Sequence, residues 1–221
     1  MDIWPTPACL SKASLEEILK EWSGLGYNRR AMYIKECAEI ITTQHRGIVP
    51  KTPEALKELP GIGPYCSGAV SCFAYNYPSI FIETNIRAVM LHFFFTGRDE
   101  VRDTEILPLL EKTLDKENPR KWYWALMDYG AALKKTTINP NRRSAHYTRQ
   151  SAFKGSLRQV RGALIRSLVK SGPAGADELQ KSLDVKTEKE DFYQALESLE
   201  KDSLVAEKNG LYSIKNSVHF Y

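Results

Sequence analysis

The feature that most constrains the fold is a seven-residue turn with two glycines, Leu59-Pro60-Gly61-Ile62-Gly63-Pro64-Tyr65, between two segments with helical patterns. The preceding segment begins at Thr52-Pro53-Glu54, which supplies an N-cap, a proline at the first helical position and an early carboxylate. Two glycines let the backbone turn tightly and approach a phosphate, which the free N–H groups of the following helix attract. The turn predicts an anion-binding hairpin between helices, although an ordinary turn between two helices has the same spacing.

Helical periodicity dominates the first two thirds of the chain. Ser14-Leu15-Glu16-Glu17 form a capping box that begins a helix, and no strand-like alternation competes with the helical pattern that follows. The later helical segments are expected over residues 27–43, 52–60, 64–75, 83–95, 104–114 and 119–133. The sequence therefore predicts an all-α domain over residues 1–135.

The C-terminal end has a different pattern. Helices are expected over residues 156–169, 176–183 and 187–199, and two short strands then flank Asn209-Gly210, a pair typical of a hairpin whose turn positions need positive φ. This order predicts a small α+β winged helix-turn-helix domain over residues 156–221. Its candidate recognition segment, 187–199, is rich in glutamate, so contact with a protein partner or a scaffolding role is favoured over contact with DNA.

A basic linker over residues 136–155 is expected between the two domains. It lies within residues 129–176, which hold ten basic side chains and no acidic one, although the whole chain has a net charge of only +4. Basic side chains interleaved with Tyr147 and Phe153 suit a polyanion, because neutralised phosphates release their counterions. Nucleic acid is the favoured partner, and a merely solvated linker is the alternative.

Composition excludes several other classes of protein. No apolar run approaches the ~20 residues that cross a bilayer, and the N-terminus lacks the basic and apolar regions of a signal peptide. We therefore expect a cytoplasmic protein, associated with the nucleoid in a prokaryote, with no membrane partner. The four cysteines form no C-x-x-C pair and the four histidines are scattered, so neither a metal site nor a cofactor is predicted.

The glycine turn and three further segments resemble the A/G-specific adenine DNA glycosylases of the helix-hairpin-helix (HhH-GPD) superfamily. Residues 59–70 resemble the hairpin and second helix of that family, and residues 22–31 resemble its tryptophan-glycine-leucine-glycine-tyrosine segment. Residues 81–89 resemble the catalytic loop, and residues 127–131 resemble a late helix. The resemblance covers about residues 3–133 and implies an enzyme that flips a base out of the duplex and cleaves its N-glycosidic bond.

The resemblance places Glu83 where the family has a catalytic aspartate. A carboxylate there stabilises the oxocarbenium character of the sugar as the base departs, and the dipole of the following helix helps to keep it ionised. Glutamate is longer by one methylene, and a misplacement near 1 Å can cost about 10²-fold in rate. Glu83 is therefore either the catalytic carboxylate or a simple helix-start residue on a chain that has lost activity.

Two further positions bear on the base pocket. Lyases that resemble endonuclease III carry a lysine at the position of Tyr65, and tyrosine cannot form their Schiff base, so the resemblance implies a monofunctional enzyme that uses water. Tyrosine at this position is also found in mismatch thymine glycosylases. Alternatively, Tyr65 could simply pack the second helix. Asp128 is assigned to the substrate pocket, with capping of an adjacent helix as the alternative. The residues assigned to DNA binding are Leu59, Gly61, Ile62, Gly63, Tyr65, Arg87, Arg142, Arg143 and Arg149.

The sequence departs from the family at two places. The glutamine-rich helix and the general-acid glutamate that precede the segment at Ile3 in the family have no counterpart, so we expect either a truncated reading frame or a remnant of the family. The four-cysteine cluster that many relatives carry after the late helix is replaced by the basic segment from Lys134 to Arg143, which is expected to contact phosphate directly.

These features together predict a monomeric DNA base-excision repair glycosylase. Its expected substrate is double-stranded DNA with a mispaired base, and adenine opposite 8-oxoguanine is favoured. A thymine mismatch glycosylase and a catalytically inactive DNA-binding remnant are the alternatives.

Overall fold

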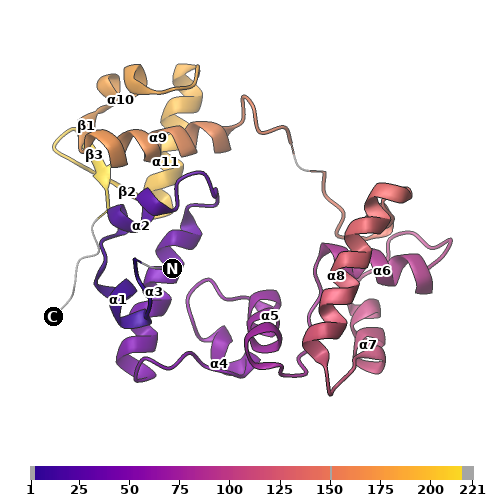
Figure 1. Ribbon diagram of the computed structural model, residues 1–221. Coiled ribbons are helices and arrows are strands. Elements are labelled where there is room, and N and C mark those ends of the chain that lie inside the picture. Colours follow the sequence, from indigo (N-terminus) through magenta and orange to yellow (C-terminus); the bar gives the residue numbers. More distant parts are fainter. Residues whose placement is uncertain (1–2, 150, 216–221) are drawn as a thin grey trace. The chain divides into compact units, whose positions relative to one another are not determined.

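The computed structural model describes residues 3–149 and 151–215, and its chain divides into two compact units (Figure 1). Unit 1 comprises residues 1–48 and 150–221, and unit 2 comprises residues 49–149. None of the described helices is both long enough and apolar enough to cross a membrane.

Unit 2 is helical and contains the glycine turn. Its elements are α4 (Pro53–Lys57), α5 (Pro64–Tyr75), α6 (Thr84–Phe94), α7 (Asp103–Thr113), α8 (Pro119–Thr136) and a 3₁₀ helix, η1 (Pro140–Arg143). Helices α6 and α8 pack closely because Gly130 of α8 has no side chain: a Cβ there would lie 2.2 Å from the carbonyl oxygen of Asn85. Ile86 and Leu91 of α6 and Tyr123 of α8 are fully buried in the shared core.

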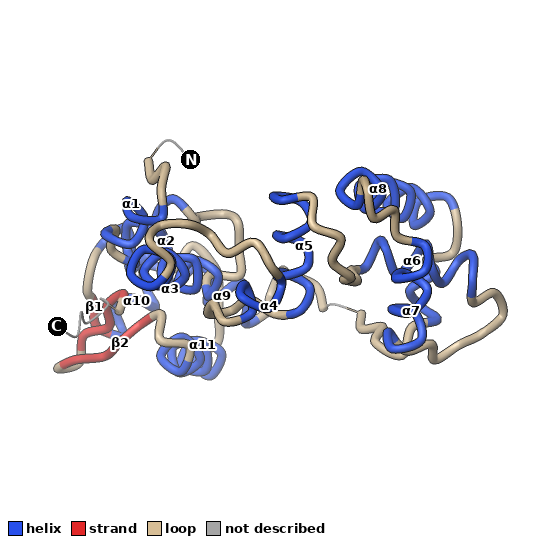
Figure 2. The backbone as a smooth tube through the Cα atoms, turned by 90° about the horizontal axis from the view of Figure 1, so that it is seen from below, coloured by secondary structure: helices blue, strands red, loops and turns tan. Residues whose placement is uncertain are grey.

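Unit 1 combines the first helices of the chain with its C-terminal elements. They are α1 (Pro7–Lys12), α2 (Leu15–Glu21), α3 (Arg29–Gln44), α9 (Leu157–Ser171), β1 (Ala174–Gly175), α10 (Ala176–Ser182), α11 (Lys189–Lys201), β2 (Val205–Lys208) and β3 (Leu211–Ile214). The three strands form one antiparallel sheet in the order β1-β3-β2, drawn in red in Figure 2. Asn209 and Gly210 have φ values of 55° and 81°, which confirms the predicted hairpin turn.

One apolar cluster joins the two sequence segments of unit 1. Ile18 and Leu19 of α2 are buried in the same cluster as Leu164 of α9 and Leu196 of α11, and α2, α9 and α11 lie together in Figure 1. The compact units therefore differ from the division predicted at residues 135 and 156, because the apolar face of α2 is buried against the C-terminal elements.

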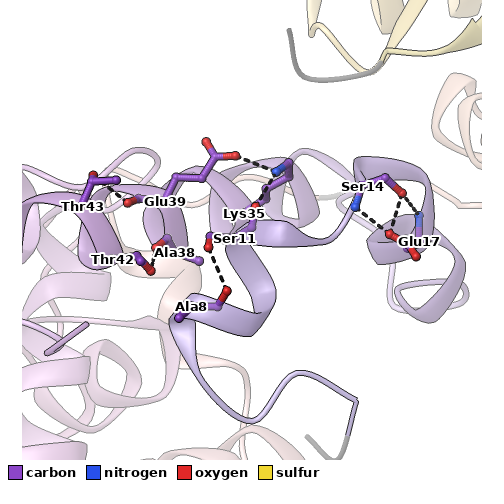
Figure 3. A network of polar contacts seen from close by, with 9 residues as sticks. All are labelled: Ala8, Ser11, Ser14, Glu17, Lys35, Ala38, Glu39, Thr42 and Thr43. Atoms are coloured by element: carbon purple, nitrogen blue, oxygen red, sulfur yellow. Dashed lines mark hydrogen bonds and ion pairs between the residues drawn. The ribbon is translucent and has the colours of Figure 1, made fainter. Parts of the chain in front are cut away.

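A buried lysine connects α1 to α3. The Lys35 side chain donates to the carbonyl oxygen of Ser11 at 3.1 Å and forms an ion pair with Glu39 at 2.6 Å (Figure 3). Lys35 is 3% exposed, so both partners are needed to stabilise its charge in this position. The same view shows Ser14 and Glu17, whose reciprocal hydrogen bonds confirm the predicted capping box.

The predicted helices are all present, within a few residues of their expected ends. Three elements were not predicted: α1, the strand β1 and the 3₁₀ helix η1. The start of α1 carries the same local pattern as α4, since Thr6 caps the helix and Pro7 occupies its first position. Helix η1 lies inside the segment expected to be a linker, and its Asn141 is only 4% exposed.

Candidate active site

The glycine turn leads into α5 as predicted, but its two glycines have different conformations. Gly61 has a φ of 70°, in the left-handed region that favours glycine, whereas Gly63 is extended and caps α5. No side chain caps this helix, and Pro64 at its first position has no N–H. The next backbone N–H groups, of Tyr65 and Cys66, are thus left for an external acceptor. Leu59 is 4% exposed and anchors the turn in the core.

Glu83 caps α6 with its own carboxylate. Its Oε1 accepts hydrogen bonds from the backbone N–H groups of Asn85, at 2.7 Å, and Ile86, at 2.9 Å. The side chain folds back onto the first turn of α6, so the carboxylate lies at the positive end of the helix dipole. Oε2 has no hydrogen-bond partner among the described residues.

Tyr65 lies near Glu83. Burial raises the pKa of the Tyr65 phenol above its usual value, and the nearby Glu83 carboxylate and Cys66 thiol raise it further. The phenol is therefore neutral at physiological pH and can donate a hydrogen bond. The Tyr65 ring is 44% exposed and makes an edge contact with Phe81, with ring centroids 6.0 Å apart.

The loop before Glu83 is held from two sides. Phe81 stacks on Tyr123 of α8, with ring centroids 4.0 Å apart, and approaches α5 at Gly68, where a Cβ would lie 2.8 Å from its own Cβ. The Tyr123 hydroxyl accepts from the Phe81 N–H at 3.2 Å and donates to the carbonyl oxygen of Ser79 at 3.1 Å. These contacts fix the chain two residues before the carboxylate.

Asp128 lies on the exposed side of α8. It has no hydrogen-bond partner among the residues that the structure describes, so it does not cap a neighbouring helix here. Its place in the base pocket remains a prediction.

The arginines assigned to DNA differ in their surroundings. Arg87 makes a bidentate ion pair with Asp103, with both bonds at 2.7 Å, and its guanidinium holds the pKa of Asp103 below the ordinary value. Arg143 donates to the carbonyl oxygens of Leu91 and Phe95, at the end of α6. Arg142 and Arg149 are exposed.

Two side chains beside the candidate site were not predicted from the sequence, Tyr123 and Asn141. The Asn141 amide nitrogen donates to the carbonyl oxygen of Thr84 at 3.0 Å, which brings the basic segment onto the first turn of α6. The Asn139-Pro140 pair before it favours turn formation and could have indicated an ordered turn. Within residues 3–149 and 151–215, no group of three or more histidine, cysteine, aspartate or glutamate side chains could hold a metal ion.

Comparison with known proteins connects this arrangement to one family. A family model described as "HhH-GPD superfamily base excision DNA repair protein" matches residues 1–113. The adenine DNA glycosylase of Mycobacterium tuberculosis (strain H37Rv) is 35% identical over 228 residues, which cover 91% of this chain and 72% of that protein. The adenine DNA glycosylase of Mycolicibacterium smegmatis is 32% identical, over 73% of this chain and 61% of that protein.

Two solved structures share the fold. A thermostable thymine-DNA glycosylase aligns with a TM-score of 0.52 and 24% identity, over 59% of this chain and 61% of that chain. A trapped endonuclease III–DNA covalent intermediate aligns with a TM-score of 0.50 and 24% identity, over 59% of this chain and 62% of that chain.

The family match over half of the chain and the identity to the mycobacterial protein show the class, a DNA base-excision repair protein. The chain belongs to the HhH-GPD superfamily of base excision DNA repair proteins. The resemblance predicted from the four sequence segments is thereby confirmed, with adenine DNA glycosylases among the similar proteins.

Proposed function

We propose that this protein is a monofunctional DNA glycosylase that removes a mispaired adenine by hydrolysis. The observation that carries the proposal is the Glu83 carboxylate, which is fixed by two backbone N–H groups through Oε1 while Oε2 has no partner among the described residues. A carboxylate held in this way stabilises positive charge on a sugar without having to reorganise during the reaction.

In the proposed reaction the target nucleotide is extruded from the duplex, which costs a few kcal/mol of stacking. As the bond between the base and C1′ breaks, the sugar gains oxocarbenium character and Oε2 of Glu83 faces the developing charge. Water then adds to C1′, and the proton that it loses is taken up by the departed base, leaving neutral adenine and an abasic site. Tyr65 supplies a neutral phenol and no amine, which supports hydrolysis over a Schiff-base lyase reaction.

We propose that DNA backbone contacts come from the glycine turn and from exposed arginines. The N–H groups after Gly63 suit a phosphate oxygen. Arg142 and Arg149 are exposed, have no ion-pair partner among the described residues, and can add ionic contacts. Arg87 and Arg143 are already bonded within unit 2, so we assign them to holding α6 in place.

Adenine is the proposed base because the named relatives are adenine DNA glycosylases. The opposite base is proposed to be 8-oxoguanine. Thymine opposite guanine is the second candidate, since tyrosine at position 65 is compatible with both families of enzyme.

We propose a winged-helix domain for the C-terminal elements of unit 1. The order α9, β1, α10, α11, β2, β3 and the antiparallel sheet support it. Glu190, Asp191 and Glu197 lie exposed on α11, and their charge favours a protein partner over DNA.

The test is a single-turnover assay on duplexes with adenine opposite 8-oxoguanine or thymine opposite guanine. Glu83→Gln keeps the size of the side chain and removes its charge, and we expect it to slow base release by about 10²–10³-fold. Glu83→Asp, the matched control, keeps the charge and should retain measurable activity. Strand breaks should appear only after alkali treatment, because a monofunctional enzyme leaves an intact abasic strand.

The assay separates the alternatives. A wild-type chain that is inert while Glu83→Asp cleaves would identify a degenerate enzyme. Duplex binding with a steep salt dependence and no cleavage by any variant would identify a DNA-binding protein without chemistry.

A further inference from the structure

The residues that follow α8 form a strap across α6. The strap is defined as residues 139–145 and contains η1. Two backbone hydrogen bonds attach it to Val101: the Val101 N–H donates to the Arg143 carbonyl at 3.0 Å, and the Ala145 N–H donates to the Val101 carbonyl at 2.9 Å. Val101 is fully buried, so this attachment is to the core of unit 2.

The strap meets α6 at both ends. At the C-terminal end, the Arg143 guanidinium donates to Leu91 at 2.7 Å and to Phe95 at 2.8 Å. At the N-terminal end, Asn141 donates to the Thr84 carbonyl at 3.0 Å. An α-helix of this length spans roughly 16 Å, so only the Asn141 contact is close to Glu83.

The Asn141 contact acts on the peptide group that holds the carboxylate. The Thr84 carbonyl and the Asn85 N–H belong to the same planar peptide unit. The Asn141 side chain donates to the oxygen of this peptide unit, and the N–H of the same unit, that of Asn85, donates to Glu83 Oε1 at 2.7 Å. A hydrogen bond accepted by the carbonyl orients this plane and polarises its N–H toward the carboxylate.

Asn141 is itself held in one orientation. Its amide nitrogen also donates to Asn139 Oδ1 at 3.2 Å, and its backbone N–H donates to the same oxygen at 3.1 Å. Its own Oδ1 is buried and accepts no hydrogen bond from the described residues. The amide is therefore used as a donor, and Thr84 is the acceptor that it reaches outside the strap.

We propose that Asn141 is a positioning residue for Glu83, which it orients through the peptide between Thr84 and Asn85. The strap thus sets the direction of the Glu83 carboxylate as well as holding α6. The inference rests on the proposed glycosylase function only where it predicts a change in the rate of base release. The orientation of the peptide is a property of the folded chain and does not depend on that function.

The experiment compares Asn141→Leu, which keeps the volume and removes the donor, with Ser144→Ala as the matched control. Ser144 is also buried in the strap, but among the described residues its hydroxyl bonds only to the His146 N–H and to no group of α6. We expect Asn141→Leu to slow single-turnover base release by about 10- to 100-fold and to leave the duplex dissociation constant within about twofold. Ser144→Ala should leave both unchanged.

Amide hydrogen exchange followed by NMR gives a readout without activity. In Asn141→Leu the N–H groups of Asn85 and Ile86 should exchange faster, while those in the middle of α6 keep the wild-type rate. Asn141→Ser is the second variant if the leucine chain does not fold, because its short hydroxyl cannot reach Thr84.

Three outcomes would overturn the proposal. They are unchanged exchange at Asn85 and Ile86, an unchanged rate of base release in an active protein, and equal losses in Ser144→Ala and Asn141→Leu. If the wild-type chain releases no base, the proposed function fails, and the exchange rates alone decide whether Asn141 positions Glu83.

Discussion

Helices α5 and α6 are neighbours in the sequence of unit 2, and they differ in how the N–H groups of their first turn are bonded. Helix α5 follows Gly63, an N-cap without a side chain, and its first available N–H groups have no cap among the described residues. Helix α6 follows Glu83, whose carboxylate accepts from the N–H groups of Asn85 and Ile86. Both ends attract negative charge for the same physical reason, the unpaired N–H groups and the dipole of the helix.

The difference shows how one type of element can serve binding or chemistry. An open N-terminus accepts an anion from another molecule, such as a phosphate of DNA. A capped N-terminus fixes an anion that belongs to the protein, and in α6 this leaves the second carboxylate oxygen without a partner among the described residues. The surrounding contacts keep the two ends different, because α5 has a glycine with free space around it and α6 is packed against α8 and the strap.

The largest expected effect comes from disrupting the packing of α8 against the N-terminal end of α6, the end that Glu83 caps. Gly130→Ala would place a Cβ 2.2 Å from the carbonyl oxygen of Asn85, so α6 and α8 must move apart. We expect a loss of about 3 kcal/mol in the free energy of unfolding, at the upper end of overpacking costs. Urea denaturation measures it.

Gly162→Ala in α9 is the matched control. Its Cβ would meet only the flexible end of Arg166, at 3.4 Å. This variant should be stabilised by about 0.5–1 kcal/mol through helix propensity. Equal effects of the two substitutions would show that α6 and α8 are not in close contact at Gly130.

The next effect concerns the loop that leads to the capped end. Tyr123→Phe removes the hydroxyl that bonds to Phe81 and Ser79, and we expect a loss of about 1–3 kcal/mol at neutral pH because two buried backbone groups lose their partner. Burial raises the pKa of Tyr123 to about 12, from an ordinary value of 10.0. The unfolded chain then loses its proton at lower pH than the folded one, so the stability linked to the neutral phenol is complete below pH 10 and is lost as the pH rises toward 12.

The wild type should therefore approach Tyr123→Phe in stability over this alkaline range, as measured by denaturation at several pH values. Burial also raises the pKa of Cys37 and Cys72 to about 11. Cys37 is common to both proteins and cancels in the difference, whereas Cys72 interacts with Tyr123 and raises its pKa further. A gap between the two proteins that widens from pH 10 to 12 would contradict the assignment.

The smallest expected effect comes from capping the open end. Gly63 has an extended backbone, and a Cβ at this position would have no atom within 4 Å, so Gly63→Asp can supply a carboxylate cap to α5. We expect this cap to stabilise the protein by a few tenths of a kcal/mol and to weaken duplex binding by about tenfold, because the added charge repels phosphate. Thermal denaturation and fluorescence anisotropy measure the two effects.

Gly63→Asn is the control, since asparagine caps nearly as well without the charge. It should stabilise the protein similarly and weaken binding less than aspartate does. If Gly63→Asp leaves duplex affinity unchanged at low salt, the turn does not contact phosphate.

Local signals in the sequence were enough for most of the secondary structure. The capping box at Ser14, the Thr52-Pro53 start of α4 and the Asn209-Gly210 turn were all predicted from a few adjacent residues, and the structure confirms them. Helix α1 was missed although it begins with the same pattern of threonine and proline as α4. The candidate site residues Glu83 and Tyr65 came from a resemblance to a family, and in the structure the Glu83 carboxylate is near enough to help raise the pKa of the Tyr65 phenol.

The sequence by itself determined where helices begin and end, because caps, prolines and glycines act on the backbone within one turn. Only the tertiary structure decided which helix faces share a core and which side chain supports the carboxylate. Asn141 reaches Thr84 across 57 residues of chain, and Tyr123 reaches Phe81 across 42. Such contacts depend on how the helices pack, which no local pattern encodes. They hold the N-terminal end of α6 and the loop before it, whereas the N-terminal end of α5 has no side-chain cap.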